Sequence, residues 1–321
     1  MSDLDTHPAV RVCGGRDGVS AEPVHELIAG REVSLGTGHP VRRVLPTLGR
    51  RMVGAWCFAD QYGPDDVAGQ EGMQVAPHPH MGLQTVSWLR QGEVLHRDSV
   101  GSLARVLPGH LGLMTSGHGI AHSEESPDPH PTFLHGVQLW VALPDAHRNT
   151  APAWEHHTEL PTFSAAGLDG TVIMGEFDGA SSPGTAYTPL AGADLTLAAG
   201  ADVRIPLNRD FEYAAIANEP GAVVDGVALP VGSLLYLGCG RTDLHLRADA
   251  AANVVLIGGE PFDEEIVMWW NFVARTHDEI AEGRRQWQAD ERFGTVHGYH
   301  APRLDAPSLP ATPLKPRGRT R

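Results

Sequence analysis

Short segments of alternating apolar and polar residues, separated by turn-forming residues, recur between residues 72 and 143. Gly92 and the Pro108-Gly109 pair mark turns between these segments, because glycine and proline favour turn conformations. The apolar stretches are residues 84–89, 94–100, 112–115 and 133–143. A spacing of about 8 to 12 residues between short strands is typical of sandwiches and barrels. We therefore predict an all-β fold.

The same rhythm resumes in the second half of the chain. Residues 144–165 carry three prolines and a polar mixture, which is typical of a linker. The 321 residues also exceed the length of one average domain. We therefore predict an N-terminal domain over residues 1–150 and a C-terminal domain over residues 151–296.

One helix is predicted near residues 276–292. Thr276 and Glu279 have the spacing of a capping box, and Phe293-Gly294 ends the helix-forming composition. Beyond it, residues 297–321 hold five prolines. Residues 301–321 include one lysine, four arginines and one aspartate, which gives a net charge of +4. We predict a flexible basic tail.

Charge and composition exclude several classes of protein. A net charge of −15 disfavours direct nucleic-acid binding, which needs a basic face, although it permits a protein partner. Three cysteines cannot form a disulfide framework and suggest a reducing compartment. The N-terminal residues lack the pattern of a signal peptide, and no apolar run is long enough for a membrane span. We therefore expect a cytoplasmic protein without membrane contact.

Two pairs of potential metal ligands lie in the first domain. His78 and His80 are two residues apart, and so are His122 and Glu124. Residues two apart on a strand share a face, so each pair can point to one side of a sheet. Three imidazoles and a carboxylate suit a metal ion bound between neighbouring strands. With 18 histidines in the chain, an isolated His-x-His motif is also expected by chance.

Glycines frame the first pair. Gly72 precedes His78 by six residues and Gly82 follows His80 by two, which resembles the first motif of the cupins. Cupins usually carry a glutamate where this chain has Gln84, and an amide is a poor metal ligand. With that departure, the sequence resembles the pirin family over most of residues 42–294. The matching stretches are 77–82 (PHPHMG), 96–101 (HRDSVG), 114–124 (MTSGHGIAHSE), 136–141 (GVQLWV), 258–261 (GGEP) and 271–273 (NFV).

The resemblance implies a bicupin, with two β-barrel or jelly-roll domains and the predicted C-terminal helix. It also implies a mononuclear iron, most simply Fe(II), held in the first domain by His78, His80, His122 and Glu124. Four protein ligands leave two positions of an octahedral ion open for O₂ or a chelating substrate. Imidazole and carboxylate ligands also accept other divalent first-row metals. Residues 206–210 lack a His pair, so we expect no metal in the second domain.

The resemblance implies two alternative functions. The first is quercetin 2,3-dioxygenase activity, in which a flavonol-like aromatic substrate reacts with O₂ and loses carbon monoxide. Glu124 is then the candidate catalytic base. The second is a non-catalytic, iron-dependent regulatory partner of a transcription factor or metabolic enzyme, with the oxidation state of the iron as a switch.

Four further polar residues near the motifs are ambiguous. His96 and Asp98 share a strand face, where they either hold metal ligands by hydrogen bonds or form a structural pair. His110 follows a Pro-Gly turn and is predicted to face water. His118 lies four residues before His122, and the sequence does not decide whether it lines the mouth of the cavity.

Overall fold

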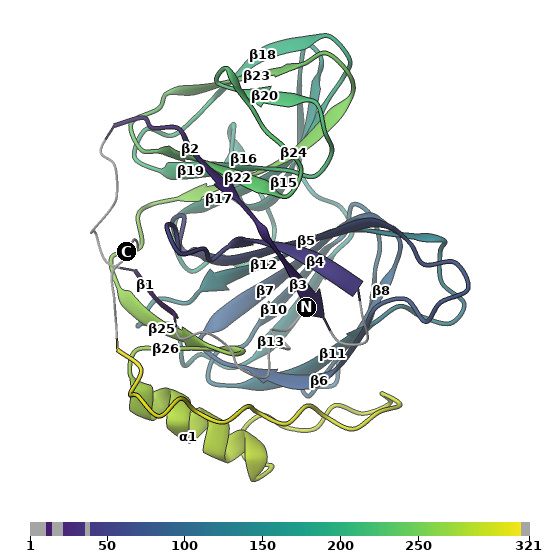
Figure 1. Ribbon diagram of the computed structural model, residues 1–321, viewed down its shortest axis with the longest axis vertical. Helices are drawn as coiled ribbons and strands as arrows, with labels where there is room; N and C mark the ends of the chain where they lie inside the picture. The colour runs from purple at the N-terminus through teal and green to yellow at the C-terminus, as the bar shows by residue number, and fades with distance from the viewer. Residues whose placement is uncertain (1–10, 15–21, 36–38, 316–321) are drawn as a thin grey trace.

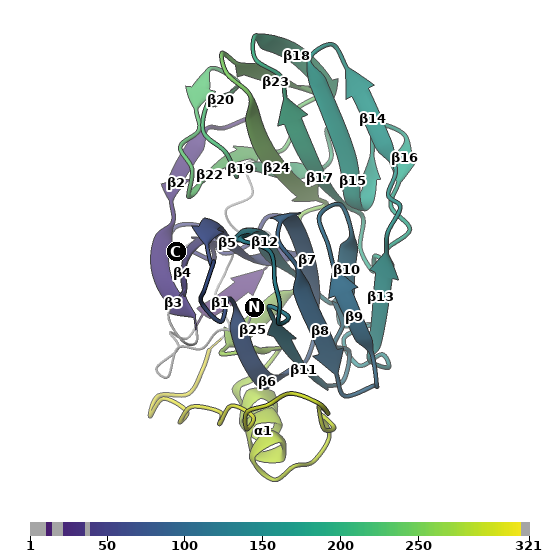
Figure 2. The ribbon, with the colours of Figure 1, turned by 90° about the vertical axis from the view of Figure 1, so that its right-hand side faces the viewer.

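The computed structural model describes residues 11–14, 22–35 and 39–315. Strands dominate, and they form two barrels stacked along the long axis of the molecule (Figures 1 and 2). The one helix among the described residues lies below the lower barrel. This is the predicted all-β, two-barrel fold with a C-terminal helix. No helix in the described part of the chain is both long and apolar enough to span a membrane.

The lower barrel is built from two sheets. The larger sheet comprises, in order, β13 (Ala153–His157), β10 (Leu111–Thr115), β7 (Leu83–Gln91), β12 (Phe133–Ala142), β5 (Trp56–Asp66), β4 (His39–Leu45) and β3 (Arg31–Leu35). The smaller sheet comprises β6 (Gln74–His80), β11 (Ile120–Glu125), β8 (Val94–Asp98) and β9 (Leu103–Val106). The four candidate metal ligands are all on β6 and β11, which are neighbours in the smaller sheet.

The upper barrel has the same construction. Its larger sheet comprises β14 (Thr162–Ala165), β15 (Leu168–Phe177), β17 (Leu190–Leu197), β24 (Ala252–Gly259), β19 (Glu212–Ala217), β22 (Ser233–Gly238) and β2 (Glu26–Ala29), with β16 (Ala180–Ser181) beside β15. Its smaller sheet comprises β18 (Ala201–Pro206), β23 (Asp243–Ala248), β20 (Ala222–Val224) and β21 (Val227–Ala228). Side chains alternate between buried and exposed along β18, as a strand with one face on a core requires.

The two barrels exchange segments. Strand β2 comes from the N-terminal part of the chain but pairs with β22 in the upper barrel. In the opposite direction, β25 (Glu265–Trp269) and β26 (Phe272–Ala274) form a small sheet with β1 (Arg11–Gly14). Strand β26 reaches β6, because Phe272 bridges to Met81. The domain boundary at residue 150 stays a prediction. In space, each barrel includes strands from the part of the chain that mainly forms the other barrel.

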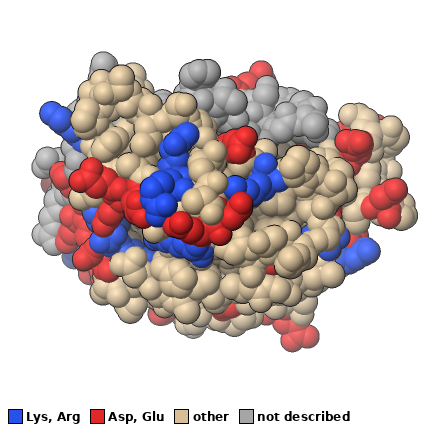
Figure 3. All heavy atoms as spheres, turned by 90° about the horizontal axis from the view of Figure 1, so that it is seen from below, with Lys and Arg blue, Asp and Glu red and all other residues tan. Residues whose placement is uncertain are grey.

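The helix α1 (His277–Gln288) begins where the sequence predicts. Thr276 is its N-cap and accepts a hydrogen bond from the Glu279 amide at 3.2 Å. It ends at Gln288 rather than near residue 292, because Asp290 and Arg292 adopt positive φ angles of 57° and 68°. Positive and negative side chains adjoin across the face seen from below (Figure 3), and the ion pair Arg285–Glu282 lies on this helix.

The tail differs from the prediction over residues 297–315. Instead of a flexible segment, the structure shows a chain that packs along α1 and the lower barrel (Figure 1). Ala306 and Leu314 are buried, and the Leu304 carbonyl accepts a hydrogen bond from the Trp287 indole at 2.8 Å. The composition of the tail could not reveal this packing, because the residues that it contacts lie in other parts of the sequence. The rest of the predicted flexible tail, residues 316–321, lies outside the described residues.

Candidate metal centre

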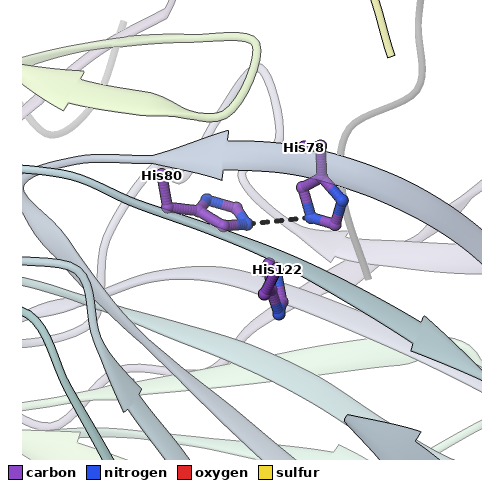
Figure 4. Close-up of side chains that lie close together, drawn as sticks. All are labelled: His78, His80 and His122. Atoms are coloured by element: carbon purple, nitrogen blue, oxygen red, sulfur yellow. Dashed lines mark hydrogen bonds between the residues drawn. The ribbon is translucent and has the colours of Figure 1, made fainter. Parts of the chain in front are cut away.

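The three candidate histidines meet inside the lower barrel. Antiparallel pairing of β6 and β11 places His122 opposite His78 and Ile120 opposite His80. The ring centroids of His78, His80 and His122 lie 4.3 to 4.9 Å apart, and none of the three side chains is exposed to solvent. Figure 4 shows His78 and His80 facing each other, with His122 close by on the neighbouring strand. The i/i+2 spacing therefore places His78 and His80 on one face of β6, and the pairing of β6 with β11 brings His122 beside them.

Backbone carbonyls determine the tautomers of the first two rings. The Nδ1 atom of His78 lies 2.8 Å from the carbonyl oxygen of Ala76, and Nδ1 of His80 lies 3.0 Å from that of Asn271. A carbonyl can only accept, so each Nδ1 carries the proton and each Nε2 carries a lone pair. The two Nε2 atoms face each other at 3.1 Å. Two lone pairs in this position repel unless a cation lies between them.

Burial keeps these imidazoles neutral. It lowers the pKa of His78 from its ordinary value to about 3. Burial also lowers the pKa of His80 and His122 well below the ordinary value, with the neighbouring histidines contributing in the same direction. Neutral imidazole is the form that binds a metal ion, so no proton has to leave these rings before binding.

The third ring has one nitrogen without a hydrogen-bond partner and one that contacts another histidine. His122 Nε2 is buried and has no hydrogen-bond partner in the described part of the chain. Its other nitrogen, Nδ1, lies 3.5 Å from Nδ1 of His96, at the long end of the hydrogen-bond range. One ring nitrogen from each of His78, His80 and His122 lies within 4.8 Å of the other two. A buried nitrogen without a partner is costly unless a ligand completes it.

Glu124 is placed differently. It lies opposite Val75 on β6, after a register shift between His122 and Glu124, and is only 2 % exposed. Its Oε1 accepts a hydrogen bond from the Ser87 hydroxyl at 3.1 Å. Its carboxylate groups with His122 and His96 rather than with the first two histidines. The structure thus brings the three histidines together, and the complete ligand set with Glu124 stays a prediction.

His96 and Asp98 lie on β8, next to the site. Pairing of β8 with β11 places Asp98 opposite His122 and His96 opposite Glu124. His96 Nε2 lies 3.2 Å from the Asp98 carboxylate, and the Trp154 indole stacks on the imidazole of His96 with 3.7 Å between centroids. Both His96 and Asp98 are buried. His96 contacts His122 of the cluster, and Asp98 contacts His96.

The other ambiguous residues lie elsewhere. His110 is half-buried rather than facing water freely, because its Nδ1 lies 3.1 Å from Nε2 of His156 on β13. His118 is exposed in the turn before β11. Gln84 donates from its amide to the Thr115 hydroxyl and the Thr185 carbonyl, both at 2.9 Å.

Two further residues shape the site: Asn271, which sequence analysis noted only within the family-matching stretch 271–273, and Trp154, which it did not single out. Asn271 supplies the carbonyl that orients His80 from a position 191 residues away. Trp154 reaches His96 because β13 pairs with β10 at the edge of the larger sheet. No spacing rule connects either residue to the histidines, so only the fold reveals them.

The residues present fit a first-row metal ion. Imidazole nitrogens bound at about 2.1 Å and at right angles to each other lie about 3 Å apart, close to the observed separation of the His78 and His80 Nε2 atoms. Three imidazole nitrogens within 4.8 Å of one another, with a carboxylate nearby, form the donor set that such ions prefer. The interior of the upper barrel is instead filled by apolar side chains, including Val203, Leu235 and Leu256.

Comparisons with known proteins agree with this architecture. Residues 38–141 match the Pirin family, and residues 192–294 match the family described as Pirin C-terminal cupin domain. A Pseudomonas aeruginosa protein named "Putative quercetin 2,3-dioxygenase" is 44 % identical over 290 residues, covering 90 % of this chain and 92 % of that protein. A pirin-like protein of Caulobacter vibrioides is 39 % identical over 259 residues, covering 78 % and 88 %. The crystal structure of a quercetin 2,3-dioxygenase from Acinetobacter baumannii superimposes with a TM-score of 0.88 at 42 % identity, covering 91 % and 98 %.

Proposed function

This chain belongs to the pirin family, and we propose that it is a metal-dependent dioxygenase that cleaves a flavonol-like substrate with O₂. One observation carries the proposal: three buried imidazoles bring one ring nitrogen each within 4.8 Å of the others, and the Nε2 lone pairs of His78 and His80 face each other. The names of the relatives from P. aeruginosa and A. baumannii supply the substrate class.

In this proposal His78, His80, His122 and Glu124 hold the metal ion, with Fe(II) as the first choice. When bound, the ion would polarise the 3-hydroxyl of a flavonol and supply open positions for substrate and O₂. Other divalent first-row ions share this affinity for imidazole and carboxylate, so metal content must be measured rather than assumed.

Glu124 is the proposed base. Its carboxylate would accept the proton of the substrate hydroxyl, and the Ser87 hydroxyl, which donates to Oε1, orients it. The site excludes water well, since the four proposed ligands are at most 2 % exposed.

An oxygen-consumption assay tests this function. Protein loaded anaerobically with Fe(II) is mixed with quercetin in aerated buffer, while an electrode follows O₂ and a gas detector follows carbon monoxide. We expect O₂ uptake with matching release of carbon monoxide by the wild type, and loss of both in His80→Ala. His245→Ala, on the upper barrel, is the control and should behave as the wild type.

Two results would contradict the proposal. Fully iron-loaded wild type that takes up no O₂ with quercetin would remove the enzyme hypothesis. Equal uptake by wild type and His80→Ala would show that the reaction does not use this centre. Retained binding of a partner protein that depends on the oxidation state of iron, without turnover, would instead support the regulatory alternative.

A further inference from the structure

The three imidazoles of the centre are not held in the same way. His78 and His80 donate from Nδ1 to backbone carbonyls, which no substitution of a side chain removes. The corresponding partner of His122 is a side chain rather than a backbone carbonyl: its Nδ1 faces Nδ1 of His96 at 3.5 Å. The tautomer of His122 therefore depends on which ring nitrogen of His96 carries the proton.

The tautomer of His96 depends in turn on Asp98. One carboxylate oxygen of Asp98, Oδ1, accepts hydrogen bonds from the backbone amides of Val100 at 3.0 Å and Ser102 at 2.8 Å. The other oxygen, Oδ2, faces His96 Nε2 at 3.2 Å. An ionised carboxylate only accepts, so His96 Nε2 must carry the proton.

Following the hydrogen bonds from Asp98 then gives a single answer. With its proton on Nε2, His96 has a lone pair on Nδ1, which accepts from Nδ1–H of His122. His122 is left with a lone pair on Nε2, the buried atom that has no protein partner in the described part of the chain. The stacked Trp154 ring, at 3.7 Å and 9°, keeps the His96 imidazole in the plane that both bonds require.

We propose that Asp98 and His96 form a relay that imposes the Nδ1–H tautomer on His122 and so makes its Nε2 a metal ligand. Both are positioning residues, and the inference rests on the proposed function only in assuming that a metal ion binds the centre. Such outer hydrogen bonds orient a ligand, raise its basicity and typically change metal affinity by about 10- to 100-fold.

A direct role of His96 as a metal ligand is the competing explanation. His96 does lie in a cluster with His122 and Glu124. However, both of its ring nitrogens are already engaged, Nε2 by Asp98 and Nδ1 by His122. A ligand needs one nitrogen lone pair directed at the ion, and His96 has none left to offer.

Asp98→Asn is the most informative variant because it keeps the size of the side chain. The two backbone amides would retain the amide oxygen at the position of Oδ1, which places the amide NH₂ against His96 Nε2. That NH₂ donates, so His96 would move its proton to Nδ1. His122 Nδ1 would then have to accept, and its Nε2–H would point at the metal position.

The experiment measures Co(II) affinity of the full chain by competition with a metal-binding dye, without any flavonol. We expect Asp98→Asn and His96→Gln each to bind Co(II) about 10- to 100-fold more weakly than the wild type. Asp98→Asn should cause no further loss in a His96→Gln background, because the carboxylate acts only through that ring. Asp202→Asn is the matched control, since Asp202 faces His245 Nε2 at 2.6 Å on the upper barrel, and it should leave affinity unchanged.

X-ray absorption of the Co(II)-loaded proteins separates a relay from direct ligation. The relay predicts the same number of imidazole ligands in wild type and His96→Gln, and thermal unfolding of the metal-free variants should show that they are folded. One imidazole fewer in His96→Gln, or Asp98→Asn affinity within twofold of Asp202→Asn, would overturn the proposal. A further tenfold loss in the double variant would overturn it as well. Absence of quercetin turnover would refute the enzyme but leave these measurements unaffected.

Discussion

Burial of neutral histidines should make the metal-free protein sensitive to mild acid. The unfolded chain binds a proton at each of these histidines below a pKa of about 6.5, whereas in the folded state His78 stays neutral down to a pKa of about 3. Between these two values the unfolded state binds more protons, so the free energy of unfolding falls as the pH falls. The contribution is fully present above pH 6.5 and is progressively lost below it.

The size of the effect follows from the shift. One pH unit within this window costs about 1.4 kcal/mol per histidine, so His78 alone should remove about 2 kcal/mol of stability between pH 7 and pH 5. His80 and His122 act in the same direction, because burial lowers the pKa of each. Domains of this kind are stabilised by only about 5 to 15 kcal/mol, so the loss is a large fraction of the total.

His78→Gln tests this reasoning. Urea unfolding of metal-free protein, with a chelator present, is followed by tryptophan fluorescence at pH 7 and pH 5. The variant should lose about 2 kcal/mol less than the wild type between these two pH values, since glutamine does not titrate. His118→Gln, which changes an exposed histidine of the same barrel, is the control and should match the wild type. Equal pH dependence in wild type and His78→Gln would refute the argument.

Two further substitutions test the framework that carries the site. Asp60→Asn should destabilise the protein by about 3 to 5 kcal/mol in chemical unfolding, because it removes the carboxylate that binds the buried Arg43 guanidinium through two hydrogen bonds of 2.8 Å. Gly117→Ala should lower the melting temperature far more than Gly109→Ala, although both glycines have positive φ. A methyl group at residue 117 would overlap the Thr150 carbonyl, whereas residue 109 faces open space, and equal melting temperatures would contradict this.

The fold class and the position of the centre were readable from the sequence because they depend on local periodicity. Alternation with a period of two predicts a strand, and Gly or Pro between such stretches predicts a turn. The same period places His78 with His80 and His122 with Glu124. The structure brings the three histidines together, while the ligand set with Glu124, which the family resemblance implies, stays a prediction.

What surrounds the centre was decided only by the tertiary structure. The register of β8 against β11 makes Asp98 and His96 neighbours of His122, and strand β26 brings the Asn271 carbonyl to His80. The exchange of β2, the early end of α1 and the packing of residues 297–315 are also long-range outcomes. Spacing along the chain records which side chains share a face. It does not record which strands pair, and pairing is what brings His96 to His122 and the Asn271 carbonyl to His80.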